Sequence, residues 1–450
     1  MTADNNLRHA TDTAVSPARR AGWWTRTRSA LLRPGTLAVV DQGIVSFANF
    51  ATNALVARSS SEEDFGVYFL ALSLLYFVRG IQEQLVSSPY TIYCHRRDTG
   101  KLAVYTGSSV VHQWIVAGCL VATIGIGAFA ARATLGPGHL LTDSLFVLVA
   151  VAPFFLFREF IRKLVFAHLQ FSVAIWMDGL VAAFQLSSLL VLWKLNRLTV
   201  VNAYLIMAVA CGIPAAAWLL TTRVRWKVRR NQLWRHWTEN WRFGRWALFT
   251  HVIGCSTPYI MPWVVASFHG EATTAALGAC QTVVGIANMF VTGVSNFLSP
   301  RTAKSYAEGG RASLIRTLVN ASVLFSITLG SFTIVTACIG NWLPATIMGP
   351  QYQGLGTVML FLAASQWANA LGMVAGNGLW AMDHPRLNLS ADAMSLGFVI
   401  GLAVILVPHY EALGAAMSWL IGNLITSSWR WIILIRLLRQ HRHRELGVSC

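Results

Sequence analysis

Five ionisable side chains lie within long apolar segments of this 450-residue sequence, and they are its best candidates for chemistry. A charge inside an apolar helix is costly, so each one marks a candidate functional group. They are Asp41, Arg79, Glu83, Asp178 and Asp392. Arg79 and Glu83 are four residues apart and can pair on one helix face, at a site or as a purely structural pair. Asp41 and Glu83 are our candidates for binding a coupling ion, H⁺ or Na⁺.

Amide and hydroxyl groups form stripes on the same segments. On the first segment a stripe covers about 140° of arc: Asp41, Gln42, Ser46, Asn49, Thr52 and Asn53. On the eighth it covers about 60°: Gln281, Asn288, Thr292, Ser295 and Ser299. The tenth carries Gln366, Asn369 and Asn377. We expect such stripes to line a hydrated cavity, although single groups of this kind also hold helices together.

Twelve apolar segments position these residues. A mean hydropathy of +0.53, with 55% hydrophobic and 12% charged residues, excludes an ordinary soluble domain. A membrane-spanning helix needs about 20 mostly apolar residues. The predicted spans are 36–57, 65–87, 106–131, 142–157, 172–193, 199–221, 246–267, 272–298, 313–340, 354–380, 388–408 and 411–435. The fourth is short because charged residues crowd its end.

The second six segments repeat the pattern of the first six. Two markers recur at corresponding places: Ser88-Pro89 with Ser299-Pro300, and Gly100-Lys101 with Gly310-Arg311. Duplicated bundles are typical of secondary transporters, whose substrate path runs between the halves. We therefore predict an all-α integral membrane protein with two six-helix lobes, 36–221 and 246–436. A linker, 222–245, joins them, and tails, 1–35 and 437–450, flank them.

The net charge of +17 reflects membrane topology. With the N-terminus inside, the inner segments and adjoining span ends hold 30 of the 35 lysines and arginines, and the outer loops hold four. This asymmetry follows the positive-inside rule and predicts that both termini are cytoplasmic. It argues against nucleic acid as a partner. The N-terminus lacks the apolar core of a cleavable signal peptide, so we expect the first span to direct insertion.

The basic, tryptophan-rich stretches are expected to contact membrane lipids. The tail 1–35 carries Trp23-Trp24 among arginines, and the linker reads RVRWKVRRNQLWRHWTENWRFGRW. Tryptophan favours the headgroup region, and arginine attracts anionic lipid. We predict an interfacial anchor in the tail and a short amphipathic helix along the inner surface in the linker. A regulatory docking site is the alternative for the linker.

No catalytic residue, metal site or organic cofactor is predicted. Gly100-Lys101 has His95 where a phosphate-binding loop needs its first glycine, so ATP hydrolysis is not expected. The seven cysteines contain no CxxC pair. A membrane glycosyltransferase or glycan polymerase would need a carboxylate cluster or a large loop, and neither Asp-x-Asp nor such a loop is present. A scaffolding protein would not need polar stripes in both halves.

The segment VVDQGIVSFANFATNALVARSSSEEDFGVYFLALSLL (39–75) resembles the opening of the lipid-linked oligosaccharide flippases. These bacterial polysaccharide exporters belong to the MATE-like superfamily of multidrug, oligosaccharidyl-lipid and polysaccharide exporters. FGRWALFTHVIG (243–254), NFLSPRTAKSYAEGGRASLI (296–315), Gly349-Pro350 with Tyr352, and GNGLWAMDHPR (376–386) are similar to landmarks of the second half. The resemblance covers about 36–436. It departs at Ser59–Ser61, where Leu-Gly is common, which puts only the local turn in doubt.

This resemblance implies two lobes around a cavity that opens alternately to either face of the bacterial inner membrane. The implied substrate is a polyprenyl-pyrophosphate glycan for surface polysaccharide or lipopolysaccharide biosynthesis, and the implied partners are a polysaccharide polymerase and glycosyltransferases. Arg79 and Arg158 would bind phosphate. Amides would bind sugar: Asn49, Asn53, Gln281, Asn288 and Asn369. The alternative is a cation-coupled multidrug or metabolite exporter on the same fold, for which Asp41 and Glu83 would suit organic cations.

Overall fold

The computed structural model describes residues 34–222, 224 and 226–445. The anchor predicted for the N-terminal tail therefore lies outside the described residues. Within them the chain is helical and contains no strand. Eight helices are long and apolar enough to cross a membrane. The predicted fold class, an all-α protein of two helical lobes, is confirmed.

The N-terminal lobe (34–221) contains six long helices. They are α2 (Pro34–Ser59), α3 (Glu62–Gln82), α5 (Thr99–Leu135), α6 (Leu140–Ala167), α7 (Phe171–Lys194) and α8 (Val200–Thr221). Helix α3 continues through η1 (Glu83–Ser87), a π-helical turn, into α4 (Ser88–Tyr93) and η2 (Cys94–Arg96). Pro89 is the second residue of α4, and a proline lacks the N–H that a regular helix would use there. The Ser-Pro marker is thus the point where the second span changes its helical pitch.

The C-terminal lobe is also helical, and its two longest elements are divided by kinks. Its elements are α9 (Arg230–Cys255), α10 (Thr257–Ile339), α11 (Leu343–Met348), η3 (Pro350–Tyr352), α12 (Gly356–Ala381) and α13 (Pro385–Glu445). Helix α10 reverses at Gly270 and Gly310, whose positive φ angles suit glycine, and α13 is interrupted at Glu411. The seventh predicted span is divided between the end of α9 and the start of α10, with the break at Ser256 before Pro258.

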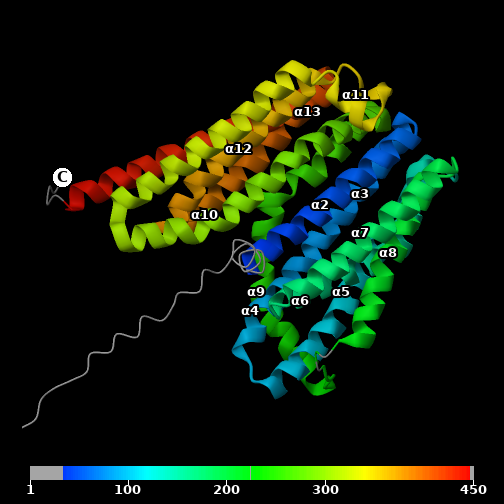
Figure 1. Ribbon diagram of the computed structural model, residues 1–450, viewed down its shortest axis with the longest axis horizontal. Coiled ribbons are helices and arrows are strands. Elements are labelled where there is room, and N and C mark those ends of the chain that lie inside the picture. The colour runs from blue at the N-terminus through cyan, green and yellow to red at the C-terminus, as the bar shows by residue number, and fades with distance from the viewer. Residues whose placement is uncertain (1–33, 223, 225, 446–450) are drawn as a thin grey trace, which may run out of the picture.

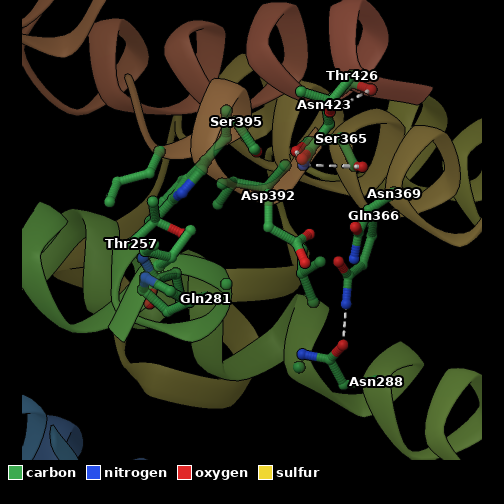
Figure 2. Close-up of a pocket in the computed structure, with 18 of the residues that line it drawn as sticks. Thr257, Gln281, Asn288, Ser365, Gln366, Asn369, Asp392, Ser395, Asn423 and Thr426 are labelled. Carbon is green, nitrogen blue, oxygen red and sulfur yellow. Dashed lines mark hydrogen bonds between the residues drawn. The ribbon is translucent and has the colours of Figure 1, made fainter. Parts of the chain in front are cut away.

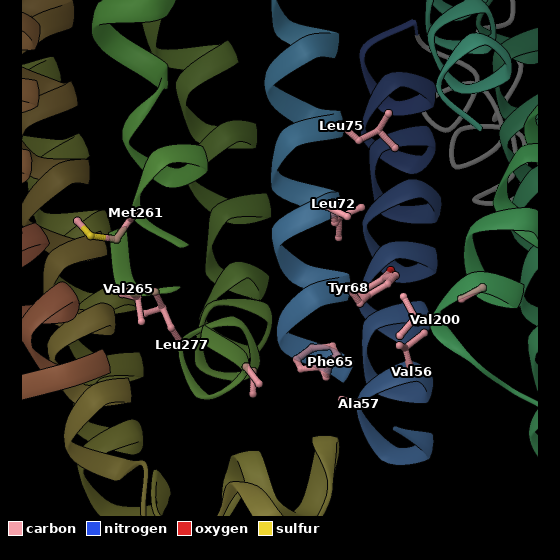
Figure 3. Close-up of a cluster of buried hydrophobic side chains, with 14 of the residues drawn as sticks. Val56, Ala57, Phe65, Tyr68, Leu72, Leu75, Val200, Met261, Val265 and Leu277 are labelled. Carbon is pink, nitrogen blue, oxygen red and sulfur yellow. The ribbon is translucent and has the colours of Figure 1, made fainter. Parts of the chain in front are cut away.

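The two lobes approach each other near α11 and diverge toward their opposite ends (Figure 1). We call these the α11 end and the open end. A buried apolar cluster joins the lobes: Val56, Phe65 and Leu72 come from the N-terminal lobe, and Met261 and Leu277 from the C-terminal lobe (Figure 3). The principal seam is the pairing of α3 with α10.

Polar contacts close the α11 end. The Arg58 guanidinium donates to the carbonyl of Ile347 at 2.8 Å and to that of Thr346, both near the C-terminus of α11. Carbonyls at a helix C-terminus lack helical partners, so a cation there is favourable. Gly66 lies so close to Glu271 that a Cβ would sit 1.9 Å from its carbonyl oxygen. Backbone therefore meets backbone where the lobes join.

The predicted linker forms the first half of α9, and its polar side is buried against the N-terminal lobe. His236 and Asn240, four residues apart, are both buried. The Tyr105 hydroxyl donates to Asn240 Oδ1 at 2.7 Å, and His236 Nδ1 lies 2.8 Å from Ser108 Oγ. Trp234 and Trp241 are exposed on the outer side. The linker is amphipathic, as expected, but protein covers its polar side while tryptophans face outward.

A second set of contacts holds the same helix. Arg97 donates to Glu239 Oε2 at 2.5 Å and lies 3.8 Å from the centre of the Tyr105 ring. The Lys227 N–H donates to the Ala103 carbonyl at 2.8 Å. The linker thus belongs by contact to the N-terminal lobe, although its helix continues into the first span of the C-terminal lobe.

The contact between α9 and the N-terminal lobe should weaken in acid. Burial, followed by the charge of Arg97, lowers the pKa of His236 from 6.5 to about 4. The folded state thus favours the neutral ring, so its contribution to stability is complete above about pH 6.5 and falls as the pH drops toward 4. We expect the thermal unfolding midpoint to fall over this range. His236→Asn should flatten the dependence, and His409→Asn, at an exposed histidine, should not. Equal pH profiles for all three proteins would contradict this.

Arg58→Ala should favour opening of the α11 end, because two hydrogen bonds across the seam are lost. Since Arg58 is exposed, we expect the fraction of molecules with an open α11 end to rise only about two- to fivefold. The measurement is the maleimide labelling rate of Thr282→Cys, a seam position, in an otherwise cysteine-free chain. Arg132→Ala, another exposed arginine at a helix end, is the control. An unchanged labelling rate would show that Arg58 does not hold this end closed.

Candidate functional site

Eight ionised groups form a charge cluster inside the N-terminal lobe. It joins α2, α3, η1, α6 and α7 and contains Asp41, Arg79, Glu83, Arg158, Glu159, Arg162, Lys163 and Asp178. Helix α6 supplies four members because it continues to Ala167, beyond the predicted end at 157. The helix thus extends past the predicted end of the fourth span, and the charges there are paired inside the lobe.

Two arginines and two aspartates pair with one another in the interior of the cluster. Arg158 and Arg162 are four residues apart on α6 and share Asp178. Arg162 lies 2.6 Å from Asp178 and 2.5 Å from Asp41, while Arg158 also pairs with Glu159. Removing one partner from a buried pair leaves an uncompensated charge, which is strongly destabilising. These contacts therefore fix α2, α6 and α7 relative to one another.

The accessible edge of the cluster is cationic. The exposed fraction of the side chain is 35% for Lys163 and 34% for Arg79, against 20% for Glu83 and 5% for Glu159. Lys163 lies 2.6 Å from Glu83, and Arg79 lies 3.4 Å from Glu159. Asp41 and Asp178 are essentially inaccessible. The cluster holds four cations and four carboxylates, yet its two most exposed members, Arg79 and Lys163, are both cations.

This edge lies at the seam between the lobes. Gly80, next to Arg79, is so close to His251 of α9 that a Cβ would fall 2.2 Å from Nε2. The Phe77 and Tyr259 rings, on α3 and α10, are 6.3 Å apart. Arg79 is therefore next to the divided seventh span, on the side of the N-terminal lobe that faces the C-terminal lobe.

The C-terminal lobe contains a polar pocket of about 240 Å³. It lies between α9, α10, α12 and α13, and its polar side chains converge on one space (Figure 2). The polar lining consists of Thr257, Gln281, Asn288, Ser365, Gln366, Asn369, Asp392, Ser395, Asn423, Thr426 and Arg430. Asp392 and Arg430 form an ion pair. The Asn423 amide donates to Ser365 Oγ at 2.9 Å, and that of Gln366 donates to Asn288 Oδ1.

Seven of the nine sequence-predicted residues fall in three places. Gln281, Asn288 and Asn369 line the pocket together. Arg79 and Glu83 lie at the edge of the charge cluster, whereas Arg158 and Asp41 lie in its interior.

The two predicted asparagines of α2 belong neither to the pocket nor to the charge cluster. Asn49 is exposed on α2. Asn53 bridges the seam, since it donates to Thr282 at 3.2 Å and accepts from the Tyr68 hydroxyl at 3.1 Å.

Sequence reasoning missed Arg162, Lys163 and Arg430. The first two were predicted to crowd the end of the fourth span, and the third was counted among the charges on the inner side. One signal was present in the sequence: Asp178 and Asp392 both lie close to the start of the fifth span of their half, and each has an arginine partner. An acid that recurs at the same depth in both halves predicts that each half also supplies a cation to pair with it.

Comparison with known proteins identifies the fold. No protein-family model matches the sequence, and no curated protein matches it. An inward-facing multidrug resistance MATE family transporter of the MOP superfamily matches with a TM-score of 0.74 and 14% identity, over 88% of this chain and 95% of that one. The lipid II flippase MurJ, inward closed, matches with a TM-score of 0.71 and 12% identity, over 88% and 86%.

An outward-facing MATE transporter matches less well, with a TM-score of 0.62 and 15% identity, over 92% of this chain and 96% of that one. These proteins are transporters and a flippase, not enzymes. The chain therefore has the two-lobed helical fold that MATE transporters of the MOP superfamily share with the flippase MurJ.

Proposed function

We propose that this protein is an alternating-access transporter that moves a lipid-linked oligosaccharide from the inner to the outer leaflet of the bacterial inner membrane. Its substrate is a polyprenyl pyrophosphate carrying a glycan for surface polysaccharide. The observation that supports this most directly is the cationic edge of the charge cluster, where Arg79 and Lys163 are the most exposed members.

Pyrophosphate suits this edge chemically. An arginine can bind two phosphate oxygens at once, and a lysine adds a mobile point charge. Glu83 now neutralises both cations, at 3.7 Å from Arg79 and 2.6 Å from Lys163. A bound pyrophosphate would replace Glu83 as their partner. An organic cation would need an accessible acid instead, and Glu83, the most exposed acid of this cluster, is less exposed than Arg79 and Lys163, which disfavours multidrug export.

The arrangement of the lobes suits loading from the inner leaflet. If both termini are cytoplasmic, as the charge asymmetry predicts, the open end faces the cytoplasm. The higher TM-score to the inward-facing than to the outward-facing MATE transporter agrees with this orientation. The headgroup would enter between the lobes while the lipid tail stays in the bilayer. A polymerase and glycosyltransferases are the proposed partners on this route.

We assign ion coupling to Asp41 and Glu83, with H⁺ or Na⁺ as the ion. Asp41 Oδ1 is buried and has no hydrogen-bond partner, while Oδ2 accepts from Arg162. The free oxygen can take a proton or contribute to a sodium site. Glu83 becomes available for an ion once the pyrophosphate replaces it. Substrate binding and ion binding would then be linked through Arg79 and Lys163.

The combined change Arg79→Ala and Lys163→Ala should abolish flipping, because it removes both accessible cations. In a strain lacking this gene, we expect the finished lipid-linked repeat to accumulate on the cytoplasmic leaflet. The wild-type gene should clear it and the double variant should not, as measured by leaflet-specific modification and mass spectrometry of extracted lipids. Lys304→Ala, at an exposed lysine elsewhere, is the control. Full clearance by the double variant, or no accumulation in the deletion strain, would contradict the proposal.

Asp41→Asn should separate transport from its driving force, because an amide cannot bind a proton at this position. In proteoliposomes, we expect a pH or sodium gradient to accelerate flipping by the wild-type protein and to have no effect on the variant. Exchange without a gradient should persist in both. Equal acceleration in the variant would remove Asp41 from the coupling mechanism.

A further inference from the structure

The pocket of the C-terminal lobe has the properties of a subsite for one neutral sugar. We propose that it binds a single sugar ring next to the pyrophosphate and thereby selects which glycan is transported. This inference rests on the proposed function, since it assumes a lipid-linked glycan. It adds a second recognition element, separate from the cationic edge.

The size of the pocket suits one ring. Sites for drug-sized ligands have volumes of about 300–1,000 Å³, whereas this pocket has about 240 Å³. A glycan chain would not fit within it. The remaining sugars would therefore extend into the space between the lobes.

The polar lining of the pocket suits a ligand that carries hydroxyl groups. Gln281 Nε2 and Arg430 Nε are buried donors without an acceptor, and such groups are destabilising until a ligand satisfies them. The Asp392 carboxylate accepts from Arg430 and keeps an exposed fraction of 30%. The lining thus offers donors and acceptors together. A hydroxyl both donates and accepts, whereas a phosphate mainly accepts and an ammonium only donates.

The ligand expected here is uncharged. The ionised residues in the lining are Asp392 and Arg430, and they neutralise each other. Trp419, Leu362 and Leu396 supply an apolar wall. A pyranose ring has one polar rim and a C–H face, which matches a pocket of amides beside an aromatic ring.

The position of the pocket fits the order of groups in the substrate. Ile253 and Gly254 of α9 line the pocket, and His251 on the same helix touches Gly80, next to Arg79. The end of α9 therefore lies between the helix of Arg79 and the pocket. A pyrophosphate at Arg79 would have its first sugar close to the pocket, and the substrate would bridge the two lobes.

The test compares the affinities of the full-length protein, in nanodiscs, for carriers that differ only in their sugar. The probes are polyprenyl pyrophosphate alone and the same carrier bearing glucose, galactose, N-acetylglucosamine or glucuronic acid. We expect one neutral sugar to tighten binding about tenfold, equivalent to about 1.4 kcal/mol. Gln281→Met and Asn369→Leu, which keep size but remove the amides, should lose this gain and keep the affinity for the bare carrier.

Asn377→Leu is the matched control, since Asn377 lies on the same helix as Asn369 but bonds to its own Met373 carbonyl. This variant should keep the full gain. Equal affinity for all probes, a gain that survives both pocket variants, or preference for glucuronic acid would overturn the sugar subsite while the carrier still binds. Failure to bind even the bare carrier would overturn the proposed function as well.

Discussion

The structure depends on the need to pair every charge that is placed between membrane-spanning helices. The charges of Arg158 and Arg162 would be uncompensated in the N-terminal lobe without Asp178 and Asp41 beside them. Their pairs join α6 to α7 and α2, so the interactions that neutralise the charges also set the positions of the helices. The same interior holds the exposed edge of the cluster in place. Arg79 pairs with Glu159, and Glu159 also pairs with the buried Arg158. A cationic surface for a ligand is thus built on a fixed ionic interior.

The two lobes share a topology but differ in chemistry. Asp178 and Asp392 occupy similar depths in the fifth span of each half, and arginines pair with both. In the N-terminal lobe the pair belongs to an eight-member cluster, while in the C-terminal lobe it stands among amides and hydroxyls. One lobe therefore suits an anion and the other a neutral polar group. A substrate with both parts would engage both lobes, whereas a small organic cation would find a strong partner in neither.

The fold was largely predictable, because hydrophobic runs of about 20 residues and repeated Ser-Pro markers depend only on local sequence. The polar stripes also placed Gln281, Asn288 and Asn369 correctly on one side of the C-terminal lobe, since helical periodicity determines which residues share a face. Ion pairs between different helices could not be predicted from helical periodicity. Lys163 was assigned to a boundary because its neutralising partner, Glu83, is 80 residues away in the chain. Arg158 was expected to face a cavity, and only the structure shows both of its ends occupied by carboxylates.

The contact of Gly66 with the Glu271 backbone has a mechanical consequence. Because Gly66 has no side chain, α3 and α10 meet there main chain to main chain, whereas at Gly278 the Phe69 ring fills the space that a Cβ would take. The close contact at Gly66 can act as a fulcrum, around which one bundle tilts while the side chains farther along the seam shift against one another. Helix α3, with 21 residues, is about 31 Å long. A tilt of about 10° at the fulcrum would move its far end by roughly 5 Å over that length, enough to turn a small rearrangement at one membrane face into a wide aperture at the other.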